Sequence, residues 1–270
     1  MLQNLHTHIK MCDGKNTAEE MLVSAIGMGF DSLGFSSHGA TPRKLFWELD
    51  FAEEYVREIT ALKTKYSDRI KVYLGLEADY YSAGEFAPQV YDYVIGSVHT
   101  FAKGDRLIAF DNTAEIAQEH IKIDFNSDPF LYTGAYYELL ADLPNRFHFD
   151  IVGHFDVVTK FSEVAPSLID FESKKYINQS LEALWAVREK CEIFEVNTGA
   201  IGRGYKKTPY PAPHIMREMK NLNCKLVLTS DTHSTTSLMT GFAEAKEYIH
   251  SFGFDTVYYL GDNGFFGEKI

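Results

Sequence analysis

The sequence has few cysteines, and no two of them are spaced like a redox or zinc-binding pair. Cys12, Cys191 and Cys224 are odd in number and far apart, so the chain contains no CxxC motif and no disulfide framework is expected. Because unpaired cysteines are typical of reducing compartments, we expect a cytoplasmic protein. The chain also lacks any apolar run approaching about 18 residues, which excludes a transmembrane helix. Candidate functional residues begin at His6, so we expect no signal peptide.

Positive charge is also scarce, because the 270 residues carry a net charge of −12. This balance argues against a nucleic-acid-binding protein, which normally presents a basic face. The hydrophobic share of 45% and the charged share of 24% are ordinary globular values. No Pro/Ser-rich linker or low-complexity block divides the chain. We therefore expect one α/β domain over residues 1–270, with neither a membrane nor a nucleic-acid partner.

Seven short apolar runs are the most informative feature that is present. Six of them end in, or run directly into, His, Glu or Asp, and the exception ends in Asn197-Thr198. A parallel barrel whose active site lies at the carboxyl ends of its strands would produce this pattern. The runs are QNLHTH (3–8), SLGFSSH (32–38), KVYLGLE (71–77), DYVIGSVH (92–99), FDIVGH (149–154), EIFEVNT (192–198) and KLVLTSDTH (225–233).

Helical patterns separate these runs. Thr17 to Glu20 form a capping box before the first helix, and further helices are expected near 48–65, 113–123, 133–142, 172–190, 212–221 and 240–251. The alternation implies parallel strands joined by right-handed crossovers. It predicts a (β/α) barrel of about seven units, with a doubly wound open sheet as the alternative. The long interval at about 100–148 is expected to form a lid or a pocket wall.

The strand ends carry residues that bind metal. His6 and His8 form an H-x-H pair, and Asp231 and His233 repeat its spacing; side chains at i and i+2 share one face of a strand and can reach one ion. For any one histidine alone, a packed or exposed side chain without metal is the better interpretation. The shared placement of the whole set favours a metal centre. The other candidate ligands are Asp13, His38, Glu77, His99 and His154.

Nine ligands are more than one or two ions need, because a catalytic zinc site takes about three protein ligands and keeps one position open. Three ions with Glu77 as a bridge would use all nine and leave room for water. The mixture of histidine and carboxylate suits Zn, Fe or Mn. Three carboxylates against three divalent ions leave a local charge of about +3, which would attract a phosphate dianion.

These residues resemble the PHP superfamily (polymerase and histidinol phosphatase), and within it the histidinol-phosphate phosphatase branch. The resemblance covers about residues 1–260 and implies a distorted (β/α)7 TIM-like barrel with a trinuclear metal centre. It also implies hydrolysis of L-histidinol phosphate, a small phosphomonoester of histidine biosynthesis. The matching segments are NLHTHIKMCDG, SLGFSSHGA, LGLEADY, DYVIGSVHTF, DIVGHFD, FEVNTGAIGRG and LTSDTH.

The resemblance also implies which residues hold each ion. The first ion takes His6, His8, Glu77 and Asp231, the second takes Glu77, His99 and His154, and the third takes Asp13, His38 and His233. Many PHP members have His at the position of Asp13, and the phosphatase branch accepts Asp there.

We expect a hydroxide that bridges two ions to attack phosphorus, while the third ion holds a phosphate oxygen. Arg203 is the predicted phosphate clamp, because its guanidinium pairs with phosphate oxygens; a solvated loop arginine is the alternative. Lys160 and Ser37 are further candidates for phosphate binding. Asp156 could orient a ligand or protonate the leaving alkoxide.

Three other functions stay open at this point. A PHP-type enzyme could act on another phosphomonoester, such as a phosphotyrosyl peptide. A related barrel hydrolase that cleaves C–N bonds would share the H-x-H motif, but it would be expected to carry a strand-end lysine or a single catalytic Asp. A non-catalytic metal-binding module would contain metal and show no phosphatase activity. The sequence does not reveal the oligomeric state.

Overall fold

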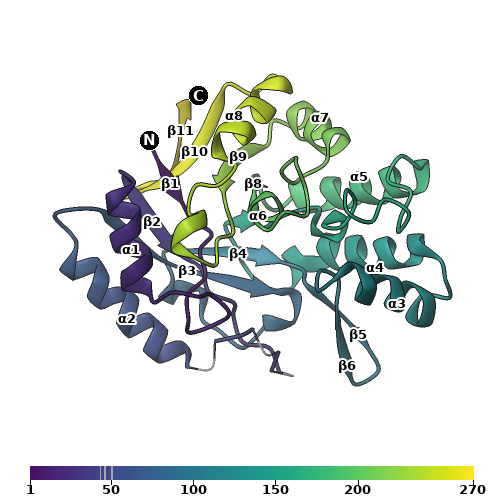
Figure 1. Cartoon of the computed structure of the whole chain (residues 1–270), viewed down its shortest axis with the longest axis horizontal. Coiled ribbons are helices and arrows are strands. Elements are labelled where there is room, and N and C mark those ends of the chain that lie inside the picture. Colours follow the sequence, from purple (N-terminus) through teal and green to yellow (C-terminus); the bar gives the residue numbers. More distant parts are fainter. Residues whose placement is uncertain (43, 46, 50) are drawn as a thin grey trace.

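The computed structural model describes residues 1–42, 44–45, 47–49 and 51–270. Seven parallel strands form its central sheet, in the order β1-β2-β3-β4-β7-β8-β9 (Figure 1). The strands are β1 (Gln3–Asn4), β2 (Ser32–Phe35), β3 (Lys71–Asp79), β4 (Tyr93–Ser97), β7 (Ile151–Val152), β8 (Ile193–Asn197) and β9 (Lys225–Thr229). Each coincides with one of the seven predicted apolar runs, and β3 continues two residues beyond its run, to Asp79.

The sheet curls into a nearly closed barrel. Its two edges meet just beyond β1 and β9, where Thr7 and Thr232 form a parallel bridge. His8 N donates to Thr232 O at 2.8 Å, and Thr232 N donates to His6 O at 3.2 Å. The distorted (β/α)7 barrel is therefore confirmed and the open sheet is excluded. The same closure places the H-x-H segment beside the segment that carries Asp231.

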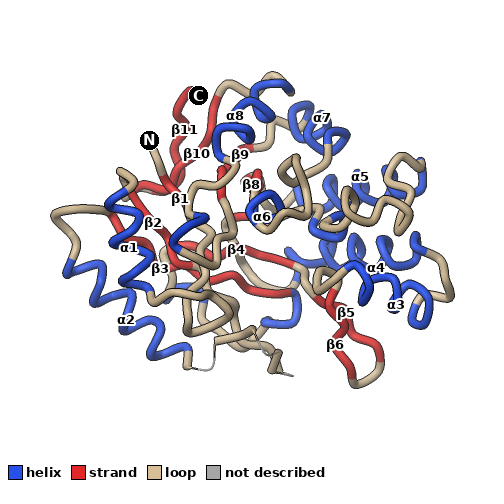
Figure 2. The backbone as a smooth tube through the Cα atoms, viewed as in Figure 1, coloured by secondary structure: helices blue, strands red, loops and turns tan. Residues whose placement is uncertain are grey.

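Helices surround the strands (Figure 2). They are α1 (Ala18–Gly27), α2 (Ala52–Lys65), α3 (Ala114–Asp124), α4 (Pro129–Asp142), α5 (Lys174–Arg188), α6 (Gly199–Gly202), α7 (Pro213–Asn221) and α8 (Phe242–Ser251). The predicted capping box is confirmed, because Glu20 N donates to Thr17 Oγ1 at 3.2 Å and Thr17 N donates to Glu20 Oε2 at 2.8 Å. Among the described residues, no helix combines the length and hydrophobicity needed to cross a membrane.

Helix α2 begins at Ala52, later than the predicted start at Glu48. Glu48 is buried, and its carboxylate accepts hydrogen bonds from Thr41 N at 2.9 Å and from Thr41 Oγ1 at 2.5 Å. These bonds hold Glu48 in the loop before the helix, because a local side-chain to backbone bond competes with helix formation.

A small apolar cluster fills the barrel interior. Tyr93 lies across the interior, and its ring occupies the space where a Cβ at Gly75 would sit, so only glycine fits there. The hairpin of β10 (Thr256–Gly261) and β11 (Gly264–Lys269) packs against this cluster through Leu260, whose carbonyl accepts from the Tyr73 hydroxyl at 2.9 Å. The cluster consists of Leu5, Tyr73, Tyr93, Ile95, Ile151, Ile193, Val227 and Leu260.

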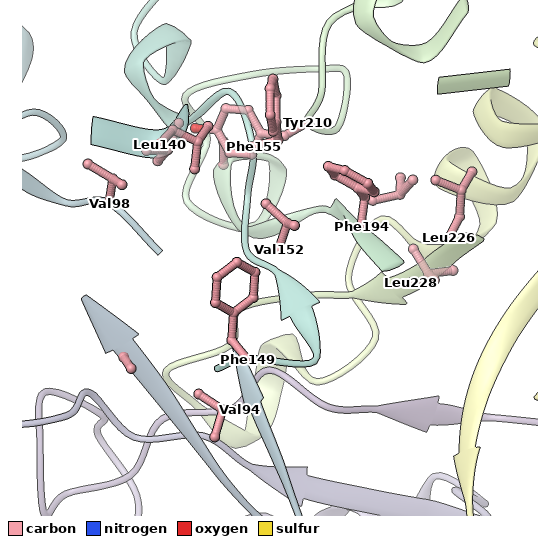
Figure 3. Packing of buried hydrophobic residues seen from close by; sticks show 14 of the residues in the cluster. Val94, Val98, Leu140, Phe149, Val152, Phe155, Phe194, Tyr210, Leu226 and Leu228 are labelled. Atoms are coloured by element: carbon pink, nitrogen blue, oxygen red, sulfur yellow. The ribbon is translucent and has the colours of Figure 1, made fainter. Parts of the chain in front are cut away.

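A larger apolar cluster lies between the strands and the helices. Figure 3 shows Phe149, Val152 and Phe194 in this layer, with Leu226 beside them. All four side chains are at most 5% exposed. Interiors packed to this degree have low compressibility, so the barrel forms a rigid frame for the residues at its mouth.

The long interval after His99 holds a hairpin and two helices. The hairpin of β5 (Thr100–Lys103) and β6 (Arg106–Ala109) extends away from the barrel, and α3 and α4 follow it (Figure 1). Ala109 and Asp111 line a cavity at the mouth of the barrel. The interval thus contributes to a pocket wall, while a lid movement stays a prediction.

Candidate metal centre

The nine predicted ligands converge at the carboxyl ends of the barrel strands. They form four overlapping groups of three or four residues whose ligand atoms all lie within 4.8 Å of one another. The groups are His8, Asp13, His38 and His233; His6, His8 and Glu77; His6, His154 and Asp231; and His38, Glu77 and His99. All strands of the sheet except β8 carry ligands at or just beyond their carboxyl ends, as a site at the barrel mouth requires.

Glu77 lies at the centre of this set and is 1% exposed. Its Oε2 atom is 3.1 Å from His6 Nε2 and 3.3 Å from His8 Nε2. Its Oε1 atom is 2.8 Å from His154 Nε2 and 3.3 Å from His99 Nε2. One carboxylate therefore faces histidines on both of its oxygens, which is the arrangement of a bridging ligand.

The remaining carboxylates flank this centre. Asp13 Oδ2 lies 3.1 Å from His233 Nε2 and 3.8 Å from His38 Nε2. Asp231 Oδ1 lies 3.2 Å from His8 Nε2. Asp231 has a φ of +46°, in the left-handed region that a residue with a side chain adopts only when its surroundings hold it there. Strained backbone at such a position is typical of functional sites.

Several ligand atoms face other ligand atoms without making a hydrogen bond to the described part of the chain. His6 Nε2, His8 Nε2 and Glu77 Oε2 are buried and lack a hydrogen bond among the described residues. His99 Nε2 and His154 Nε2 face each other at 3.1 Å. Buried polar atoms without partners are costly, and two facing ring nitrogens are satisfied by a cation that both can bind. The residues therefore fit divalent metal ions of the kind that histidine and carboxylate ligands hold.

The electrostatics of the centre favour the ligand forms of His8 and Glu77. Burial, with the neighbouring His233 and His38 as further causes, lowers the pKa of His8 to about 3. Burial alone would raise the pKa of Glu77, but His6, His99 and His38 hold it well below its ordinary value. A neutral imidazole and an ionised carboxylate are the forms that metals bind. For His6, His38 and His99, burial alone would lower the pKa, but the nearby carboxylates raise it above its ordinary value, so a metal ion must displace a proton from these rings.

Sequence reasoning missed Glu195, which holds two of the histidines in place. Glu195 lies on β8 and is fully buried. Its Oε1 atom is 2.6 Å from His6 Nδ1, and its Oε2 atom accepts from His154 N at 2.7 Å. A ligating histidine usually donates its second ring nitrogen to such a carboxylate. An ionisable residue in the middle of a buried apolar strand is the signal that could have revealed it.

A cavity of about 260 Å³ opens over the centre. Arg203, which lines it, donates from Nη2 to Asp231 Oδ2 at 2.8 Å and from Nη1 to Asp231 O at 3.1 Å. Lys160 also lines it and donates to Asp111 O at 2.6 Å and to Asp111 Oδ2 at 3.1 Å. Two of the predicted phosphate-binding cations therefore lie at the metal centre.

Ser37 and Asp156 are placed differently, and neither is among the described residues that line this cavity. Ser37 Oγ is buried and has no hydrogen bond to the described part of the chain. The Asp156 carboxylate accepts from the hydroxyls of Tyr137 and Tyr176, the latter at 2.8 Å, and from Ala212 N at 3.2 Å. Their roles in phosphate binding and proton transfer stay predictions.

Comparisons with known proteins agree with this site. The PHP domain family matches residues 4–199. The probable histidinol-phosphatase of Deinococcus radiodurans is 30% identical over 93% of this chain and 94% of its own length. The crystal structure of HisK from Listeria monocytogenes has a TM-score of 0.77 at 19% identity, over 90% of this chain and 99% of that one. The histidinol phosphate phosphatase of Lactococcus lactis, crystallised with Zn, L-histidinol and phosphate, gives 0.65 at 21% identity over 98% of each chain.

Proposed function

The chain belongs to the PHP domain family, and we propose that it is a metal-dependent phosphatase that hydrolyses L-histidinol phosphate to L-histidinol and inorganic phosphate. One observation carries the proposal: nine residues of metal-ligating type converge in a chain that aligns over nearly its whole length with proteins named histidinol-phosphatase. We propose that residues 1–270 act as a single catalytic domain in histidine biosynthesis.

We propose that the centre holds three divalent ions, Zn, Fe or Mn, in the three ligand sets implied by the sequence. His6, His8, Glu77 and Asp231 would hold the first, Glu77, His99 and His154 the second, and Asp13, His38 and His233 the third. When bound, such ions supply Lewis acidity toward phosphate oxygens and lower the pKa of water. The short distances from both Glu77 oxygens to histidine nitrogens support the bridging role.

The cationic side chains of the cavity would bind the phosphate group. Hydrogen bonds from both terminal nitrogens of Arg203 to Asp231 hold its guanidinium at the wall of the cavity, and its other N–H groups would remain for the phosphate. A guanidinium pairs with two phosphate oxygens at once, so Arg203 would fix the orientation of the ester. Lys160 would add a second positive charge, and Ser37 stays a candidate donor. These charges stabilise the negative charge that gathers on the phosphoryl oxygens during the reaction.

The cavity also suits the organic part of this substrate. Its volume of about 260 Å³ fits a small molecule and leaves little space for a peptide chain. Asp111 is its one lining carboxylate, among the described residues, that is not a proposed metal ligand. Burial alone would raise the pKa of Asp111, but Lys160 and His99 lower it to about 2. Asp111 would therefore be ionised and could accept a hydrogen bond from the ammonium or imidazole of histidinol.

In the reaction, a water oxygen bonds to phosphorus while the ester P–O bond breaks, and the leaving alkoxide takes up a proton. Asp156 stays the candidate donor from the sequence. The three hydrogen bonds to its carboxylate favour a structural role for Asp156 instead. They connect the loop at Ala212 to Tyr137 of α4 and Tyr176 of α5.

The test is phosphate release by metal-loaded protein from L-histidinol phosphate, p-nitrophenyl phosphate and a phosphotyrosyl peptide. The proposal predicts a kcat/KM above about 10⁴ M⁻¹s⁻¹ for L-histidinol phosphate and far lower values for the other two. Equal, slow rates on all three would keep the phosphatase chemistry but refute the substrate. A preference for the peptide would favour the alternative PHP-type phosphoesterase.

A further inference from the structure

A second cavity, of about 630 Å³, lies behind the wall of the metal centre. The short 3-10 helix η4 (Val157–Thr159) forms part of the partition, because Val157 and Lys160 line the metal-centre cavity while Thr159 lines the second one. Residues 162–172 and 206–214 supply most of the remaining wall, and Tyr176 of α5 completes it. None of the nine proposed metal ligands is among the described residues that line this cavity.

Lys206 is the unusual residue of this second cavity. It is 8% exposed, and Thr159 Oγ1, at 3.2 Å, is the one hydrogen-bond acceptor of its ammonium within the described part of the chain. The ring of Tyr210 lies 4.9 Å from Nζ. An ammonium has three N–H donors, and a buried one is costly unless a negative group pairs with it. Burial lowers the pKa of Lys206, and the nearby carboxylates of Asp156 and Glu163 offset only part of that shift. Among the described residues, neither carboxylate accepts a hydrogen bond from the ammonium.

The residues that line the cavity indicate which class of small molecule could bind beside Lys206. Ile169, Phe171 and Pro213 provide an apolar surface. Three exposed carboxylates, Glu163, Asp170 and Glu172, also line the cavity. A ligand with a single negative charge would pair with Lys206, whereas a second negative charge would be repelled by these acidic residues.

We propose that this cavity is a second binding site, for a small organic monocarboxylate with an apolar body, whose carboxylate pairs with Lys206 beside the Thr159 hydroxyl. The ligand would supply the missing acceptor for the buried ammonium, and its apolar body would cover Phe171 and Ile169. A carboxamide of the same shape lacks the charge, and a dicarboxylate or a phosphate carries too much.

Ligand-observed NMR on the metal-loaded protein tests the proposal, with phenylacetate, phenylacetamide and phenylmalonate as probes. Inorganic phosphate is present in excess, so that carboxylates do not bind at the metal centre. We expect saturation transfer to phenylacetate at millimolar concentration, and at least about tenfold weaker binding of the other two probes.

Two variants locate the binding. Lys206→Met removes the charge at nearly constant size and should abolish the phenylacetate signal, while Lys207→Met, at the exposed neighbour, should leave it unchanged. Ser167→Tyr fills the cavity from its exposed wall without removing Lys206. If Lys206→Met does not fold, this variant still tests whether phenylacetate binds in the second cavity. The proposal is overturned if wild-type protein gives no signal, or if the signal survives Ser167→Tyr in folded protein.

Discussion

His6 Nδ1 lies 2.6 Å from Glu195 Oε1, and neither side chain is exposed to solvent. The contact turns the imidazole so that Nε2 faces Glu77 Oε2 at 3.1 Å. The other oxygen of Glu195 accepts from the backbone of His154. Strand β8, which contributes none of the nine proposed ligands, thus positions two of them.

Replacing Glu195 with Gln should weaken metal binding, because the amide cannot supply the negative charge that orients and polarises His6. We expect metal affinity and kcat to fall by about 10–100-fold, the usual effect of removing such a partner. Metal content by elemental analysis and phosphate release by colorimetry measure the two quantities. Glu192→Gln, at the exposed residue just before the same strand, is the matched control and should behave as wild type. Full metal occupancy in the Glu195 variant would refute the positioning role.

Two glycines of α6 provide a matched pair of substitutions that tests the position of Arg203. A Cβ on Gly199 would lie 2.7 Å from Arg203 Nη2 and 2.8 Å from Asp231 Oδ2, so Gly199→Ala should push the clamp out of place. A displacement of this kind should lower kcat/KM by at least about tenfold. A Cβ on Gly202 meets nothing closer than 3.8 Å. Gly202→Ala should therefore keep wild-type kinetics, and equal effects of the two substitutions would contradict the assignment.

Arg203→Lys tests the guanidinium itself. Lysine keeps the positive charge but cannot form the two parallel hydrogen bonds of the fork. We expect kcat/KM to fall by about 10²-fold and the inhibition constant of inorganic phosphate to rise, with metal content unchanged. Unaltered inhibition by phosphate would place Arg203 outside the phosphate site.

The acid stability of the protein should depend on His214. Burial lowers its pKa to about 4, with Arg217 as a second cause, and its Nε2 atom lies 2.8 Å from Ser180 Oγ. Between pH 6.5 and pH 4 the unfolded chain binds a proton here that the folded protein does not. This contribution is therefore fully present above about pH 6.5 and is lost as the pH falls toward 4.

Because His214 is only partly buried, the loss should be on the order of 1 kcal/mol. Urea unfolding at pH 7.5 and pH 5 measures the free energy of unfolding for wild type and for His214→Gln. The variant should lose less stability on acidification, since it has no ionisable group at this position. Identical pH dependence in the two proteins would contradict the prediction.

The barrel and its ligand residues were predictable from the sequence for one physical reason. In a parallel barrel all strands end at one mouth, so the residues His38, Glu77 and His99, far apart in sequence, had to meet there. The structure brings all nine together. Strand positions followed from short apolar runs, which are typical of strands covered on both faces.

The predictions were less accurate for residues that lie beyond the end of a strand. Asp156 follows His154 by two residues, and residues two apart share a face of a strand, which is why the sequence made Asp156 a candidate for the site. Strand β7 ends at Val152, however, and a 3-10 helix begins at Val157, so that rule does not apply. The second cavity around Lys206 could not be predicted either, because it depends on how two irregular loops fold against each other.

The most direct test of the central claim is phosphate release from L-histidinol phosphate by protein stripped of metal with a chelator and then titrated with Zn or Mn. We predict no turnover in the stripped protein and full recovery as about three ions bind per chain, with Glu77→Gln unable to recover at any metal concentration. Undiminished turnover by the stripped protein, or full recovery of Glu77→Gln, would contradict a reaction that depends on this centre.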